Sequence, residues 1–274
     1  MLFFSFQLNN PTYKPAADRL FAALDLFNIK YKILNKTKDV WLRDFMPVVT
    51  RSGKLVSFRY EPSYLGGFPE LKTDFKSDVS AEIGIDGIEY SDINLDGGNV
   101  VFSPSKQKAI ISDRVFAENP ERSEAELIAE LENLLEADVI IIPSLKSDTT
   151  GHADGMARFA DENTVLVNES KSANDFESKV INTLERNGLR VIQMPYYETN
   201  RKAPDGVKSA EGCYLNYLET EKVVFFPVFS EKHETDMRAI STVRQALGKR
   251  VVPLNINEIA LYGGLLNCIS WDNK

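Results

Sequence analysis

The stretch ERSEAELIAELENLLEADVIIIP, residues 121–143, decides the fold class. Its first part has apolar residues at helical spacing, and Ser123 followed by Glu126 is a pattern typical of a helix start. Its second part, DVIIIP (138–143), is a short apolar run that ends in proline, as expected of a buried strand. The stretch therefore predicts an amphipathic helix followed by a buried strand.

The same order of elements recurs further along the chain. Hairpins are predicted at 93–112, 155–168 and 213–229, helices at 121–137, 172–188 and 234–248, and closing strands at 138–143, 189–195 and 249–255. The closing strands carry Pro143, Pro195 and Pro253, which are 52 and 58 residues apart. A period in the fifties favours a repeat architecture over an ordinary mixed α/β domain with accidental spacing.

The outer parts of the chain fit the same period. Residues 40–60 predict a hairpin with Ser-Gly in its turn, and residues 21–34 predict a helix followed by a strand. Residues 259–270 predict a hairpin arm whose partner is a first strand at 2–7. Five units of about 55 residues account for the 274 residues, so we expect one domain, 1–274, of five ββαβ units around a centre.

Two stretches fit the repeat poorly. Residues 61–92 are rich in Gly, Pro and aromatic residues, and residues 198–211 are mostly polar. Both are predicted to be long loops, either plain surface loops or lids over a site.

Composition excludes several classes of protein. The hydrophobic content of 43% and the charged content of 26% are ordinary for a soluble globular protein, and no apolar run reaches the roughly 20 residues of a membrane span. A net charge of −8 argues against a nucleic-acid partner. The two cysteines are expected to be thiols in a cytoplasmic protein, because nothing indicates export, and two histidines are too few for a His-rich metal site.

The openings of the units occupy equivalent positions, so they are expected to meet near the centre. They are Trp41-Leu42-Arg43-Asp44, Asp96-Gly97-Gly98-Asn99, Gly151-His152-Ala153-Asp154, Cys213-Tyr214-Leu215-Asn216 and the segment from Gly263 to Cys268. Although position alone selects this set, it contains two thiols, an imidazole and three carboxylates. His152 and Asp154 are two residues apart, so in a strand both side chains would enter one pocket.

These openings resemble the motifs of the agmatine deiminase and Porphyromonas-type peptidyl-arginine deiminase family, of the pentein, or guanidino-group modifying, superfamily. In the family order over residues 38–270, the matches are Trp-x-Arg-Asp (41–44) with Pro47, Leu-Asp-Gly-Gly-Asn (95–99), Gly-His-x-Asp…Arg-Phe (151–159), Tyr-Leu-Asn (214–216) and Gly-Gly…Cys (263–268). The resemblance implies an α/β fold, a pentein-type propeller of five pseudo-repeated ββαβ units, in agreement with the repeat.

The resemblance also implies hydrolytic deimination, in which a small cationic guanidino substrate and water give a ureido product and ammonia. Cys268 is then the nucleophile, and it must attack as the thiolate. His152 protonates the departing ammonia and later activates the water that resolves a covalent thiouronium intermediate. Asp44 and Asp154 grip the guanidinium, and Asp96 orients the imidazole.

Three further residues are assigned to substrate binding by the same resemblance: Trp41 over the aliphatic part of the substrate, with Asn99 and Arg158. No metal or cofactor is implied, and agmatine as substrate would link the enzyme to putrescine and polyamine formation. The oligomeric state stays open, a homo-oligomer included.

Several of these residues also have a purely structural explanation. Asp96 beside glycine is placed to cap backbone amides, Cys268 to fill a small apolar space, and Trp41 to pack. Cys213 and His233 have no motif support and are assigned to packing and to the surface.

Departures from the family pattern leave the substrate open. Asn267 and Ser270 stand where the family has His and Thr, the Gly-Pro after the Arg-Asp motif becomes Phe45-Met46-Pro47, and the N-terminal part is shorter than in typical agmatine deiminases. Agmatine, free arginine, peptidyl arginine and methylated arginine, the last as in a dimethylarginine-type hydrolase, all remain candidates.

Three functions compete with deimination. One is a non-catalytic binding protein of the same fold, and another is amidino transfer to an amine. The third is a metal hydrolase built on His152, Asp154 and Asp96, although one histidine among carboxylates is a thin ligand set for zinc.

Overall fold

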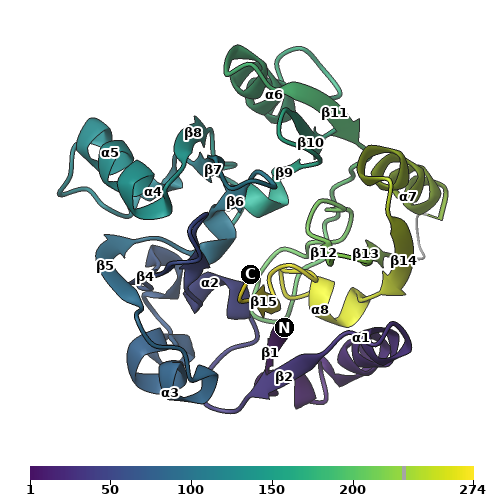
Figure 1. Ribbon diagram of the computed structural model, residues 1–274. Helices are drawn as coiled ribbons and strands as arrows, with labels where there is room; N and C mark the ends of the chain where they lie inside the picture. Colours follow the sequence, from purple (N-terminus) through teal and green to yellow (C-terminus); the bar gives the residue numbers. More distant parts are fainter. Residues whose placement is uncertain (230–232) are drawn as a thin grey trace.

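Five sheets of three strands stand around a common centre in residues 1–229 and 233–274, which the computed structural model describes (Figure 1). In each sheet the middle strand pairs antiparallel with one neighbour and parallel with the other. The parallel partner follows the middle strand through a helical segment, since two parallel strands need a crossover connection. Each sheet is therefore one of the predicted ββαβ units.

Four of the sheets are continuous in the sequence. They are β3 (Val48–Val49), β4 (Leu55–Arg59) and β5 (Glu89–Asn94); β6 (Val101–Phe102), β7 (Lys108–Ser112) and β8 (Asp138–Ile142); β9 (Ala157–Phe159), β10 (Thr164–Asn168) and β11 (Arg190–Met194); and β12 (Leu218–Glu219), β13 (Val223–Val228) and β14 (Arg250–Asn255). The closing strands β8, β11 and β14 coincide with those predicted from the repeat.

The fifth sheet joins the two ends of the chain. β15 (Ser270–Asp272) pairs antiparallel with β1 (Leu2–Ser5), which pairs parallel with β2 (Tyr31–Leu34). This confirms that the C-terminal arm finds its partner in the first strand. The predicted extent of the arm, 259–270, is wrong, because the short helix α8 (Asn257–Ala260) and a turn precede a strand that begins only at Ser270.

The long helices lie where the periodicity places them. α5 (Glu124–Leu135), α6 (Phe176–Arg186) and α7 (His233–Leu247) bury their apolar stripes, and α1 (Lys14–Leu26) starts seven residues before the predicted position. The Ser123 hydroxyl accepts from the Glu126 amide at 3.3 Å, and the Glu126 carboxylate accepts from the Ser123 amide at 3.2 Å. This confirms the predicted cap at the start of α5.

The long loop predicted at 61–92 is only partly correct. The segment begins with the short turns η2 (Ser63–Leu65) and η3 (Pro69–Leu71), but then forms the π-helical turn η4 (Phe75–Val79), α3 (Ser80–Ile83) and the strand β5. Phe75 and Val79 are buried in a cluster with Phe3 and Trp271, and this tertiary burial explains the turns where local periodicity was weak. The stretch 198–211 does lack helices and named strands.

Three of the unit openings are short helical turns and not the strands that were predicted. These turns are α2 (Leu42–Phe45), η5 (Gly97–Asn99) and η6 (Ala153–Gly155). The strand argument for His152 and Asp154 was therefore wrong in its geometry. α4 (Arg114–Ala117) and η1 (Phe6–Asn9) complete the elements of the described chain, where no helix is both long and apolar enough to cross a bilayer.

Candidate active site

Four buried ionisable side chains meet where the short turns converge. Asp44 lies on α2, Asp96 is the N-terminal cap of η5, and His152 is the cap of η6, which also carries Asp154. Their exposed fractions are 6%, 8%, 6% and 3%. In a turn this short, side chains two residues apart can point to the same side, so His152 and Asp154 share one site without a strand.

His152 is held between two carboxylates. Its Nε2 is 2.7 Å from Oδ2 of Asp96, and its Nδ1 is 3.6 Å from Oδ1 of Asp44. Burial disfavours a charged imidazole, but Asp44, Asp96 and Asp154 outweigh burial and raise the pKa of His152 to about 10. Burial raises the pKa of Asp44, and the imidazolium opposes that shift. The arrangement therefore keeps a protonated imidazole ready to donate.

Asp154 is held by two amides. Asn216 donates from Nδ2 to Oδ2 of Asp154 at 2.9 Å, and Asn267 donates to the same oxygen at 2.7 Å. These bonds satisfy the hydrogen-bonding capacity of the buried carboxylate and fix its orientation. The sequence supplied the positions of Asn216 and Asn267, in two unit openings, but not these roles.

Cys268 completes the group from the C-terminal turn. Its Sγ lies 3.7 Å from Oδ2 of Asp154, and its thiol donates to Oδ1 of Asn216 at 3.3 Å. Burial raises the pKa of Cys268 well above its ordinary value, and Asp154 and Asp44 raise it further. Cys268 is thus a protonated thiol, and a cation between Asp44 and Asp154 would favour its thiolate.

Two glycines allow these side chains to approach one another. A Cβ on Gly98 would lie 2.5 Å from Oδ1 of Asp44 and 2.8 Å from Nδ1 of His152, and the Gly98 amide donates to that Asp44 oxygen at 3.2 Å. A Cβ on Gly264 would lie 2.2 Å from the ring of Trp41. Glycine is therefore required here for space.

One cavity of about 380 Å³ exposes most of this group. Asp44, His152, Asp154, Cys268 and Trp41 all line it, so the structure brings these five predicted residues together. Asp96 is outside the lining and contacts it through His152. Tyr64 lines the cavity as well and donates to Oδ2 of Asp96 at 2.8 Å. Because residues 61–92 were interpreted as a loop from the sequence, Tyr64 was not proposed as a site residue.

Asn99 and Arg158 lie outside this cavity. The Asn99 side-chain carbonyl accepts from the amides of Ser112 and Ala153, at 2.9 and 3.1 Å, and so ties η6 to its neighbours. Arg158 lies over the Tyr217 ring and lines a second cavity of about 190 Å³. Neither residue is placed to contact a substrate in the larger cavity.

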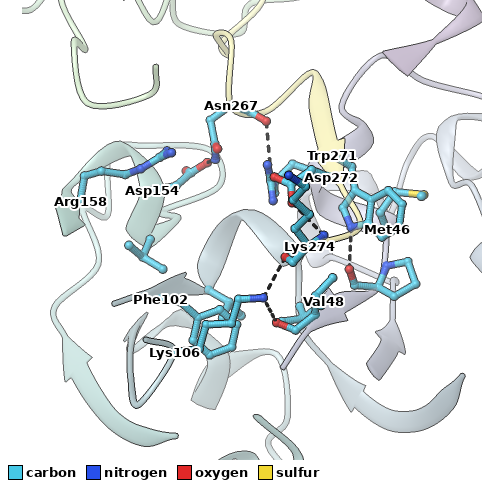
Figure 2. A pocket seen from close by; sticks show the side chains of 16 residues that line it. Met46, Val48, Phe102, Lys106, Asp154, Arg158, Asn267, Trp271, Asp272 and Lys274 are labelled. Atoms are coloured by element: carbon cyan, nitrogen blue, oxygen red, sulfur yellow. Dashed lines mark hydrogen bonds between the residues drawn. The ribbon is translucent and has the colours of Figure 1, made fainter. Parts of the chain in front are cut away.

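The second cavity lies against Asp154 from another side (Figure 2). Figure 2 shows Asn267 reaching down to Asp154, with Lys106 and the C-terminal Lys274 further away. Lys106 donates to the carbonyls of Val49 and Lys274, at 2.9 and 2.8 Å. These bonds hold the Lys106 side chain against the backbone of β3 and of the last residue.

The second thiol, Cys213, lines the larger cavity too. It is half-buried, packs against the main core and donates to the Gly155 carbonyl at 3.3 Å. Burial, with Asp154 and Asp148, raises its pKa to about 12. Both cysteines are thiols, as predicted, and His233 is exposed.

The fold is shared with solved enzymes at low sequence identity. Agmatine deiminase of Enterococcus faecalis superimposes with a TM-score of 0.78 at 17% identity, over 98% of this chain and 92% of that one. Substrate-bound agmatine deiminase of C. jejuni superimposes with a TM-score of 0.75 at 15% identity, over 98% of this chain and 92% of that one. DDAH from Pseudomonas aeruginosa, complexed with citrulline, superimposes with a TM-score of 0.58 at 13% identity, over 98% of this chain and 97% of that one. These similarities confirm the pentein-type α/β fold.

Sequence comparison identifies the family. No curated protein matches the chain. The profile of the Porphyromonas-type peptidyl-arginine deiminase family, in contrast, matches residues 8–273, nearly the whole length. This chain belongs to the Porphyromonas-type peptidyl-arginine deiminase family.

Proposed function

We propose that this protein hydrolyses a small cationic guanidine to a ureido product and ammonia, with Cys268 as nucleophile. The observation that carries the proposal is one cavity that exposes a thiol, an imidazole and two buried carboxylates, with Cys268 Sγ 3.7 Å from Asp154. The family and the fold support the same chemistry, because the enzymes of similar structure act on guanidino groups.

Binding and nucleophile activation are coupled in this proposal. A guanidinium donates N–H groups in a plane, so it needs acceptors on two sides, and Asp44 and Asp154 provide them. Its positive charge offsets the two carboxylates that disfavour the Cys268 thiolate. The thiolate therefore forms when the substrate binds, and the Cys268 proton passes to solvent because His152 already carries its own.

The reaction then follows in two halves. The Cys268 thiolate attacks the guanidinium carbon, and the C–N bond breaks as His152 gives its proton to the departing nitrogen, which leaves as ammonia. The neutral imidazole next takes a proton from water, and the hydroxide adds to the carbon of the thiouronium. The adduct then expels Cys268 as the hydroxyl proton passes to the sulfur, which yields the ureido product and regenerates the thiol.

The charges around the cavity favour a substrate with a cationic or neutral tail. The lining carries six further carboxylates: Asp39, Asp148, Glu177, Glu198, Asp205 and Glu211. Lys208, the one lysine or arginine among the described lining residues, pairs with Glu198 at 2.5 Å. A free α-carboxylate would meet repulsion here, so we infer an agmatine-like substrate over free arginine.

We further infer that the enzyme acts in the cytoplasm without metal or cofactor. With agmatine as substrate, its product would supply putrescine and polyamine formation.

The test is formation of the ureido product, with release of ammonia (or of methylamine from methylarginine), from a panel of agmatine, arginine, peptidyl arginine and methylarginine, between pH 6 and 10. We expect turnover of agmatine above the others, and loss of turnover in Cys268→Ala. A matched Cys213→Ala variant should stay active, because Cys213 has no part in the chemistry. No ammonia from any member of the panel would overturn the proposal.

A further inference from the structure

Tyr64 extends the polar network around His152 by one residue. Its hydroxyl donates to Oδ2 of Asp96 at 2.8 Å, and the same oxygen is 2.7 Å from Nε2 of His152. The Tyr64 ring also meets the imidazole edge-on, with centroids 6.2 Å apart. Tyr64 thus contacts both members of the pair that would handle the proton.

A polar clamp fixes the backbone that carries Tyr64. The Ser63 amide and hydroxyl both donate to the Glu118 carboxylate, at 3.0 and 2.6 Å. Arg114 pairs with Glu118 at 3.0 Å, donates to the Ser63 hydroxyl at 3.0 Å, and lies 5.5 Å from the centre of the Tyr64 ring. The short turn η2 is therefore anchored to α4 and the residue that follows it.

This anchoring has a specific consequence for Asp96. The carboxylate caps η5 without a side-chain hydrogen bond to that turn, so its orientation depends on partners from other units. Tyr64 and His152 both bond to one of its oxygens, which leaves one rotation of the carboxylate that satisfies both.

We propose that Tyr64 is a positioning residue, which holds Asp96 so that the imidazole of His152 keeps the orientation needed to donate its proton. The inference rests on the proposed function for its kinetic consequence, but the hydrogen bond itself is testable without a substrate. Without the hydroxyl, the carboxylate can rotate, and the imidazole loses its alignment in the steps that transfer protons.

The kinetic test compares wild type with Tyr64→Phe, which keeps the ring and removes the hydroxyl. Because a hydrogen bond to a charged group is stronger than one between neutral groups, we expect kcat to fall about tenfold or more, with KM changed less than about threefold. Ser63→Ala keeps the Tyr64 hydroxyl but removes the Ser63 hydroxyl from the clamp, so a smaller loss of kcat is expected. Tyr90→Phe is the matched control, since Tyr90 is exposed on β5 and its ring contact with Lys76 is kept.

The substrate-free test is NMR of the imidazole N–H protons. The chain has two histidines, so the spectrum is simple, and a His233→Gln variant assigns the His152 resonances. In Tyr64→Phe the Nε2–H resonance of His152 should shift and exchange faster with solvent. In Tyr90→Phe it should stay unchanged.

Two results would overturn the inference. One is wild-type kcat in Tyr64→Phe. The other is a lower kcat with an unmoved His152 resonance, which would make Tyr64 a packing residue of the cavity wall. Inactivity of the wild type on every guanidine would instead refute the proposed function, and the NMR comparison would still decide whether Tyr64 positions the pair.

Discussion

Removing the charge of Asp154 should change the selectivity of Cys268 between neutral and cationic alkylating reagents. In Asp154→Asn the side chain keeps its size and an oxygen for the amides of Asn216 and Asn267. The carboxylate oxygen lies 3.7 Å from the sulfur. At an effective dielectric constant of about 20, repulsion between two charges at such a distance is about 4 kcal/mol, or roughly three pKa units. Hydrogen bonds to Asp154 and solvent weaken it, so a tenfold change is the smallest effect expected.

The two reagents respond differently because only one carries a charge. Neutral iodoacetamide needs only the thiolate, so its second-order rate constant with Cys268 should rise at least about tenfold in Asp154→Asn. Cationic 2-chloroacetamidine loses its attraction to Asp154 while the thiolate loses its repulsion, and these terms roughly offset. The ratio of cationic to neutral rate constants should therefore fall at least about tenfold.

The assay is intact mass against time at pH 8, with peptide mapping to separate Cys268 from Cys213. The control is Asp18→Asn, whose carboxylate pairs with Lys14 on the exposed face of α1. An unchanged ratio in Asp154→Asn would show that Asp154 does not act on the thiolate electrostatically, and the coupling of binding to activation would be wrong.

Three further outcomes are expected. Gly98→Ala should lower kcat by at least about tenfold with an unchanged far-UV circular dichroism spectrum, because the new methyl group displaces Asp44 and His152; a near-normal kcat would contradict this reading of the close approach. His152 has a folded pKa of about 10, above the unfolded value of about 6.5, so its contribution to stability is full below about pH 6.5 and is lost as the pH rises through 10. Wild type should therefore lose more of its Tm than His152→Gln between pH 6.5 and 10, and parallel Tm curves would count against the raised pKa. Ser123→Ala should lower the free energy of unfolding by about 1 kcal/mol in urea denaturation while kcat stays at the wild-type value. No loss of stability would mean that the paired hydrogen bonds of Ser123 and Glu126 do not stabilise α5.

Local patterns predicted most of the architecture. Interactions between residues close in the chain determine the helical spacing in 121–137, the cap at Ser123 and the apolar closing strands. Each of these elements lies where it was expected. Gly188 and Gly248, the last residues of the helices predicted at 172–188 and 234–248, adopt positive φ angles of 76° and 62° just beyond α6 and α7. The resemblance of the unit openings added the identity of the family.

The errors have two physical causes. The turns η4 and α3 depend on burial of Phe75 and Val79 against residues from both ends of the chain, which no local window contains. The opening at 152–155 is a helical turn, so the period-two argument did not apply to it.

The sequence by itself determined the repeat, the closing strands and the unit openings from which Asp44, Asp96, His152, Asp154 and Cys268 come, because spacing and residue type are local properties. The tertiary structure alone decided which of these groups meet and in what charge state. In the folded chain Asn99 accepts hydrogen bonds from backbone amides, Asn216 and Asn267 donate to Asp154, and Tyr64 donates to Asp96. Hydrogen-bond partners and desolvation arise from residues distant in the chain, and they exist only once the five units have closed into a ring.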